Sequence, residues 1–113
     1  MSVLEETLAA QLDTAGIPYT REYKAIPKRK LSWDFAIGSQ DNILFLVEVQ
    51  GGTWSRSKMG HNSGAGIKRD IEKLNLATEH GFKCLQFTSD MVKSKRALTT
   101  IKRLYKRMVT NDK

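Results

Sequence analysis

The chain has 113 residues, a length that suits one domain with one modest core and excludes two. It carries 19 Lys and Arg against 12 Asp and Glu, and this net charge of +7 favours nucleic acid or another anionic partner. An ordinary basic soluble protein is the alternative. The single cysteine, Cys84, excludes a disulfide framework and a cysteine-based zinc site. Without a membrane-length apolar run or a signal-peptide pattern, we expect an intracellular soluble protein with no membrane contact.

The first half of the chain predicts one helix and three strands. Ser2 has the spacing of an N-cap residue with Glu5 at the third helical position, and leucines follow at helical spacing. Gly16 and Pro18 end this helix. β-Branched and aromatic residues, separated by turn residues, then predict strands over 21–26, 33–37 and 43–50, with a turn over 38–42.

The second half predicts a loop, two helices and a fourth strand. Residues 51–66 hold five glycines and predict a long loop, of the kind that often carries function. A helix with Ile67, Ile71 and Leu74 on one face follows and ends at Gly81, and a strand is expected over 82–88. The last helix, 93–108, is crowded with cations and holds no acidic residue. The order αβββαβα predicts a single α/β domain over 1–113 with a basic C-terminal helix.

The hairpin formed by the second and third strands gathers acidic residues. With its turn centred on Gln40, residues whose numbers sum to 80 face each other, so Asp34 is expected opposite Leu46 with Glu48 as its diagonal neighbour. Alternation places Gln50 on the same face as these three. The opposite face should be a continuous apolar surface made of Trp33, Phe35, Ile37, Ile43, Phe45, Val47 and Val49.

This polar cluster has the chemistry of a metal site. Neighbouring carboxylates repel one another unless a cation joins them, and oxygen ligands suit Mg²⁺ or Mn²⁺. Asp34, Glu48 and the backbone carbonyl of Val49 are the candidate ligands, and Gln50 could orient the attacking water. Ordinary exposed strand residues are the alternative reading.

A longer string of residues resembles a known nuclease family. Residues 45–54 read FLVEVQGGTW, followed by Gly60-His61, by DIEKLNLA over 70–77 and by Gly81-Phe82. With Asp34 ahead of it, this pattern resembles the PD-(D/E)xK nuclease superfamily and, within it, the small VRR-NUC branch of phages and bacteria, over about residues 2–92. The resemblance implies a restriction-endonuclease-like αβββαβ core, whose mixed central sheet is flanked by helices.

The resemblance also implies an activity: metal-dependent hydrolysis of DNA, structure-specific for branched DNA such as Holliday junctions, in the cytoplasm of a bacterium or a phage-infected host. A glutamate of the first helix joins the metal in that superfamily; Glu5 is the candidate, because Glu6 points away from the leucine face. Gln50 stands where the family has Lys, and Lys73 of the second helix is a candidate replacement.

The remaining candidates are contacts to the DNA backbone, which carry little sequence information. One active site per chain and two cuts per junction predict a C2 homodimer. The rival functions are a non-catalytic nucleic-acid-binding module that keeps the nuclease fold, and an RNA endonuclease. The predicted backbone contacts are Lys28, Arg29, Lys30, Arg56, Lys58, His61, Lys68 and Lys73.

Overall fold

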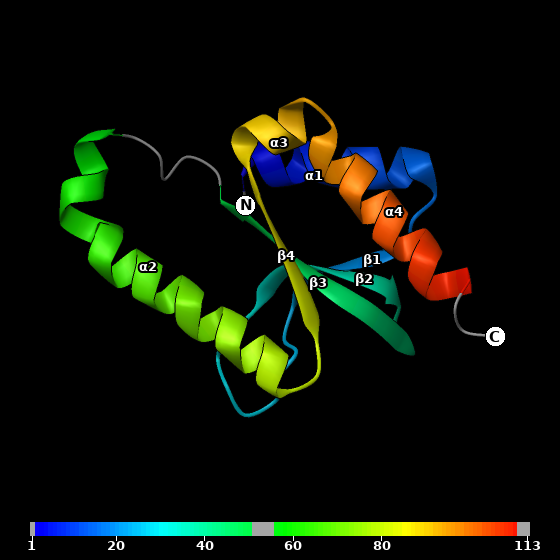
Figure 1. Ribbon diagram of the computed structural model, residues 1–113, viewed down its shortest axis with the longest axis horizontal. Coiled ribbons are helices and arrows are strands. Elements are labelled where there is room, and N and C mark those ends of the chain that lie inside the picture. Colours follow the sequence, from blue (N-terminus) through cyan, green and yellow to red (C-terminus); the bar gives the residue numbers. More distant parts are fainter. Residues whose placement is uncertain (1, 51–55, 111–113) are drawn as a thin grey trace.

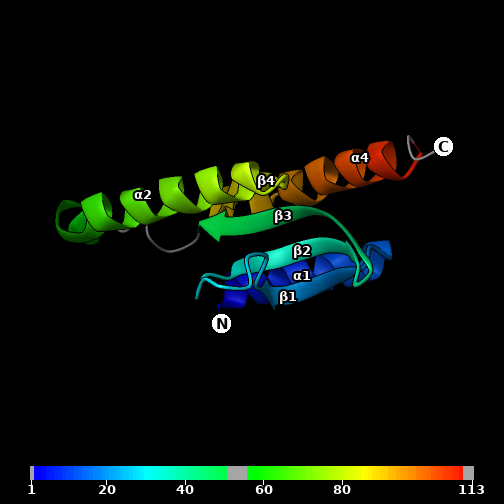
Figure 2. The same cartoon turned by 90° about the horizontal axis from the view of Figure 1, so that it is seen from below.

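A computed structural model describes residues 2–50 and 56–110, and of residues 56–65 it describes the backbone alone. It holds a four-stranded sheet in the order β1-β2-β3-β4, in which β1, β2 and β3 are antiparallel and β4 runs parallel to β3 (Figures 1 and 2). The predicted α/β fold with a mixed sheet is confirmed. The elements are α1 (Val3–Ala15), β1 (Tyr19–Tyr23), β2 (Trp33–Ser39), β3 (Asn42–Gln50), α2 (Arg56–Glu79), β4 (Lys83–Thr88), α3 (Ser89–Lys93) and α4 (Arg96–Thr110).

The sheet is covered by helices on both faces. On one face, α1, α3 and α4 pack over the central strands, with Leu8 and Ile101 fully buried against Phe35 and Phe45 (Figure 1). On the other face lie α2, through Ala77, and the segment that joins β1 to β2. Both faces of β2 and β3 are therefore buried, which explains why these strands are so rich in apolar residues.

Helix α1 begins and ends as the sequence predicts. The side chain of Ser2 accepts the backbone N–H of Glu5 at 3.1 Å, and Gly16 adopts a left-handed conformation with φ 71°. Leu8 and Leu12 on its apolar face are completely buried. These caps fix the position of the first turn of α1, which matters because Glu5 lies in it.

Three predicted boundaries are wrong. β1 covers 19–23 instead of 21–26, because Ile26 leaves the sheet and packs into the cluster beneath α2. α2 already begins at Arg56, so 56–66 is helical instead of a loop; glycine lowers helix propensity by only about 1 kcal/mol per residue, a weak preference that context overrides. The last helix, predicted over 93–108, begins later, as α4 at Arg96; Lys93 ends the separate helix α3, and Lys95 between the two has a left-handed φ of 69°.

The register of the hairpin differs from the prediction by two residues. Phe35 pairs with Val47 and Ser39 with Asn42, so the turn is two residues long, and the register shifts next to Gly38. A side chain at Gly38 would collide with the carbonyl oxygen of Asn42, and its φ of 126° also requires glycine. Asp34 is thus not opposite Leu46; continuing the register by one residue places it opposite Glu48. A shift of two residues does not by itself move side chains to the other face, so Asp34 and Glu48 stay on the same face.

Two residues nevertheless change faces. Trp33 and Ile43 pack with the cluster beneath α2 and not with Phe35 and Phe45. Ile43 pairs with Gly38, on the turn side of the register shift, where the alternation of side chains changes. Trp33 is the first residue of β2, and Lys73 Nζ lies 5.1 Å from the centre of its ring. The face that was predicted to be polar is polar only at its acidic end. Its remaining part is apolar and includes Ala36 and Leu46, which are fully buried.

Two further expectations concern single features. Cys84 is a free, partly buried thiol, and burial raises its pKa to about 11, as suits an unreactive core cysteine. No helix in the described part of the chain is long and apolar enough to cross a membrane.

Candidate metal centre

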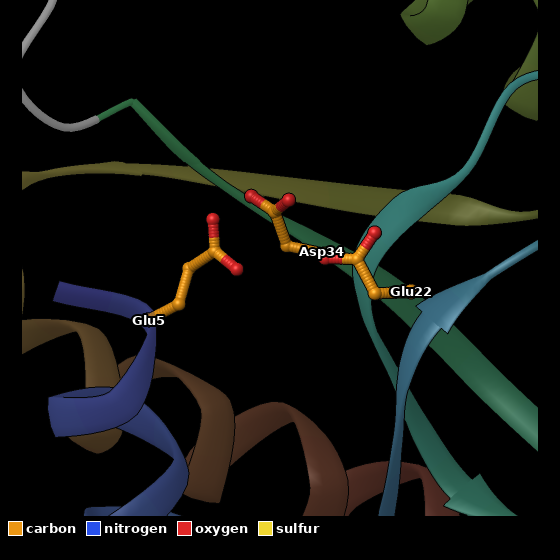
Figure 3. Close-up of side chains that lie close together, drawn as sticks. All are labelled: Glu5, Glu22 and Asp34. Atoms are coloured by element: carbon orange, nitrogen blue, oxygen red, sulfur yellow. The ribbon is translucent and has the colours of Figure 1, made fainter. Parts of the chain in front are cut away.

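Three carboxylates meet near one end of the sheet. Glu5 from α1, Glu22 from β1 and Asp34 from β2 each place one oxygen so that the three atoms lie within 4.8 Å of one another (Figure 3). We call this group the carboxylate cluster. Glu5 and Asp34 were predicted as candidate ligands, whereas Glu22 was not. Among the described residues, the cluster is a set of acidic side chains that could hold a metal ion.

The sheet register brings Glu22 to Asp34. Arg21 pairs with Phe35 and Tyr23 with Trp33, so Glu22 and Asp34 face each other across the β1–β2 ladder. Glu22 has a left-handed φ of 50°, which is uncommon for a residue other than glycine inside a strand and breaks the regular alternation there.

The first turn of α1 adds the third carboxylate. The side chain of Glu5 is only 16% exposed, while that of Glu6 is 54% exposed and pairs with Arg21 at 3.1 Å. This difference confirms the predicted orientation of α1, in which Glu5 lies beside the leucine face and Glu6 points outward. Glu5 therefore belongs to the cluster and Glu6 does not.

The cluster carries excess negative charge in a partly buried place. Burial, reinforced by the charges of Asp34 and Glu22, raises the pKa of Glu5. Burial also raises the pKa of Asp34, against the effect of a backbone hydrogen bond from Val49. Glu5 Oε1 is buried without a hydrogen bond among the described residues, and Arg21 Nη2 lies 3.6 Å from it. A buried oxygen without a donor, among like charges, fits a cation.

Asp34 and Glu48 are tied together by reciprocal hydrogen bonds. The backbone N–H of Asp34 donates to Glu48 Oε2 at 3.0 Å, and the N–H of Val49 donates to Asp34 Oδ2 at 2.8 Å. The predicted neighbourhood of the two acids is therefore present. These bonds fix the Asp34 carboxylate relative to β3. They use Asp34 Oδ2, and the second carboxylate oxygen of Asp34, Oδ1, takes no part in them.

Glu48 is engaged by Lys73 of α2. Lys73 Nζ donates to Glu48 Oε2 at 2.9 Å and to the carbonyl oxygen of Ser32 at 2.7 Å. Burial and the charge of Asp34 raise the pKa of Glu48, and Lys73 works in the opposite direction. Glu48 is adjacent to the carboxylate cluster but is not one of its three members. Its role as a metal ligand stays a prediction, and so does the role of Lys73 as the replacement for the family's Lys.

The other predicted site residues are spread more widely. Gln50 ends β3 and pairs with Thr88 of β4, adjacent to Val49. Lys28, Arg29 and Lys30 are exposed in the segment between β1 and β2, where Arg29 lies 3.6 Å from Glu72. Lys68 is exposed on α2. Their roles, and that of the Val49 carbonyl, stay predictions; the side chains of Arg56, Lys58 and His61 lie outside the described residues.

Glu22 was missed for a structural reason. Its strand was predicted, but no pattern in residues 19–26 fixes the register of β1 against β2. Regular alternation also does not describe a residue with a left-handed backbone. The sequence did show an acidic residue in the strand before the one that holds Asp34. Without the β1–β2 register, that observation does not place Glu22 beside Asp34.

The fold and the site together define an α/β protein with a mixed four-stranded sheet and a three-carboxylate cluster near the end of that sheet. Comparison with known protein families, with curated proteins and with solved structures gives no match to this chain. The nuclease resemblance therefore depends on the residues themselves.

Proposed function

We propose that this protein is a metal-dependent endonuclease that hydrolyses phosphodiester bonds in DNA, with branched DNA as its preferred substrate. The observation that carries the proposal is the carboxylate cluster of Glu5, Glu22 and Asp34 on a chain with net charge +7. The net positive charge of the protein attracts a polyanionic substrate, and a cation held by the carboxylate cluster would contact its phosphates.

The donor set fits Mg²⁺ or Mn²⁺. All three side chains offer carboxylate oxygens, the ligand type that these hard cations prefer, and no sulfur or imidazole belongs to the cluster. Glu5 Oε1 is buried and accepts no hydrogen bond among the described residues, with only Arg21 Nη2 at 3.6 Å beside it, which supports the same assignment. Such an ion would act as a Lewis acid: it would lower the pKa of a bound water, which then loses a proton more readily and becomes a better nucleophile, and it would neutralise charge on the phosphate.

The residues around the cluster hold it in place and add a positive charge. Val49 N–H fixes Asp34, and Glu48 accepts the Asp34 N–H, so the acidic end of the β2–β3 hairpin is tied together. Lys73 Nζ lies 2.9 Å from Glu48 Oε2, and we assign this residue the electrostatic role of the lysine that Gln50 replaces. Gln50 would orient water by hydrogen bonds, because an amide cannot act as a base.

A non-catalytic nucleic-acid-binding module is the second candidate. Two observations favour it: Gln50 in place of Lys, and the bond from Lys73 to Glu48 Oε2, which engages one oxygen of a predicted ligand. Such a module would bind DNA or RNA without cutting it.

A cleavage assay separates the candidates. Branched DNA, linear DNA and RNA are incubated with Mg²⁺, Mn²⁺ or EDTA, using the wild type, Asp34→Asn, Glu48→Gln and the control Glu6→Gln. The proposal expects metal-dependent cutting of DNA that Asp34→Asn abolishes and Glu6→Gln retains. Binding without cutting in every condition would establish the non-catalytic module, and cutting of RNA alone would establish an RNA endonuclease.

The predicted homodimer has a candidate surface on α2. Ile67, Ile71 and Leu74 form a stripe at helical spacing and are 56%, 53% and 38% exposed. They lie on the helix whose beginning projects away from the sheet (Figures 1 and 2). Light scattering of the wild type and of Ile71→Glu tests this: we expect a dimer that the substitution dissociates, and a wild-type monomer would exclude the two-cut form of the proposal.

A further inference from the structure

A second surface, outside the carboxylate cluster, carries most of the excess positive charge. Lys95 and five cations of α4 are all exposed, and none of them forms an ion pair within the described part of the chain. No acidic residue occurs between 91 and 110. We call these six residues the basic face: Lys95, Arg96, Lys102, Arg103, Lys106 and Arg107.

The basic face covers one side of an otherwise buried helix. At 100° per residue, the cations of α4 occupy one continuous sector, and the opposite sector packs on the sheet through Ala97 and Ile101, both fully buried. Because the apolar side is already used in the core, α4 cannot lie in a membrane interface with that side in lipid. The charges are thus exposed at the surface, where a polyanion can contact them.

A groove runs beside this surface, between α1 and α4. It has a volume of about 540 Å³ and is lined by Lys95, Leu98 and Lys102 on one side and by Ala10 and Thr14 of α1 on the other. Thr14 lies nine residues after Glu5, half a turn away around the helix, so the groove is on the outer side of α1 while Glu5 faces the sheet. The groove therefore does not share the carboxylate cluster.

We propose that the basic face and the α1–α4 groove bind the sugar–phosphate backbone of duplex DNA. The cations of α4 extend from Arg96 to Arg107, or about 16 Å of helix, and the duplex carries one phosphate charge per about 1.7 Å of its axis. A duplex of that length carries about ten phosphate charges on its two strands, and the basic face would meet those of the strand that faces it. The small residues of α1 leave room beside Lys95 and Lys102 for a backbone strand. This inference extends the proposed function but does not require it, because binding needs no metal and no cutting.

Salt-dependent binding in EDTA tests the basic face. Fluorescence anisotropy with a DNA duplex compares the wild type with Lys102→Gln/Arg103→Gln and with a control of equal net charge, Lys24→Gln/Lys83→Gln, in which two other exposed lysines are neutralised. Each lost phosphate contact should lower the slope of log K against log salt by about 0.9, so the α4 variant should lose about 1.8 in slope and bind roughly 60-fold more weakly near 0.1 M salt. The control should stay within about twofold of the wild type.

Other results would overturn the inference. Equal losses in the α4 variant and in the control would reduce the effect to net charge. A polyglutamate competitor as effective as DNA at equal charge, or binding to phosphatidylserine vesicles without binding to DNA, would assign the surface to another partner. Circular dichroism verifies that both variants are folded.

A pair of substitutions in the groove tests its part. Ala10 is exposed on α1, so Ala10→Gln and Ala10→Glu add side chains of equal length and different charge. We expect Ala10→Glu to bind DNA several-fold more weakly than Ala10→Gln, because a carboxylate would lie beside the phosphate path. Equal affinities of the two variants would remove the groove from the binding surface.

Discussion

Replacing Glu5 by Gln should stabilise the protein when metal is absent. Gln keeps the size of the side chain and removes one of three negative charges in the carboxylate cluster. Burial and the charges of Asp34 and Glu22 all raise the pKa of Glu5, so its ionised form is disfavoured in the folded state. A site that costs stability until a cation enters is the physical consequence of the proposed function.

The magnitude follows from the distances. Charges on Glu5 and Asp34 that lie within 4.8 Å repel by about 3.5 kcal/mol at an effective dielectric constant of about 20. Glu22 is exposed, so water screens most of its repulsion. Arg21, 3.6 Å from Glu5 Oε1, attracts Glu5, but it lowers the pKa of Glu5 less than Asp34 raises it, so it offsets only part of this repulsion. The balance is a gain of about 1 kcal/mol for Glu5→Gln, or about 4 °C in Tm.

Thermal unfolding at pH 7 in EDTA and in Mn²⁺ measures both effects. Wild type should gain Tm with Mn²⁺, and at 100 times the Kd this gain corresponds to about 2.7 kcal/mol. Glu5→Gln should start higher and gain less. The matched control is Glu6→Gln, which removes the same charge from the exposed pair with Arg21; it should change stability by less than about 1 kcal/mol and keep the full Mn²⁺ effect. A lower Tm for Glu5→Gln in EDTA, together with an undiminished Mn²⁺ gain, would refute the reasoning.

Three further predictions concern the same region. Since the folded-state pKa values of Glu5 and Asp34 are raised, the folded state binds their protons more tightly than the unfolded state does. The free energy of unfolding in EDTA should therefore rise as pH falls from 7 toward the ordinary pKa values of 4.5 and 3.8, with a smaller slope in Glu5→Gln. Urea titrations at pH 5 and pH 7 measure this, and a lower stability at pH 5 would contradict it. Lys73→Met should cost about 3 kcal/mol in urea unfolding, because it leaves the 8%-exposed Glu48 without its cation, and a loss below about 1 kcal/mol would contradict the ion pair. Gly38→Ala should lower the free energy of unfolding by at least about 1 kcal/mol, because its backbone has φ 126° and the new methyl would meet Asn42; an unchanged midpoint would show that the hairpin adapts.

The sequence predicted correctly that Asp34 and Glu48 share a face, because that prediction does not require the exact strand register. Side-chain alternation depends only on whether a register shift is odd or even, so a shift of two residues still left Asp34 and Glu48 as neighbours. The helical wheel of α1 separated Glu5 from Glu6 without knowledge of any contact. Both predictions depended on one element or on one hairpin.

Contacts between distant elements could not be predicted in the same way. Glu22 joins the cluster through the β1–β2 register and a left-handed backbone, neither of which a pattern specifies. The bond from Lys73 to Glu48 depends on how α2 crosses the sheet, 25 residues along the chain. The glycines of 56–66 favoured a loop, and the helix there shows how weak single-residue propensities are beside longer-range context.

The stability and the cation affinity of this site depend on the same charges. Repulsion within the carboxylate cluster lowers the stability of the metal-free fold, and a bound cation recovers that repulsion as part of its binding energy. The gain from Glu5→Gln in EDTA and the Mn²⁺ gain of the wild type should therefore decrease together as ionic strength rises, since salt screens both. Glu48 would not follow this trend as closely, because its partner Lys73 is a partly buried side chain of the same protein and not a mobile ion. A cluster that responded to salt without responding to Mn²⁺ would be an acidic surface and not a metal centre.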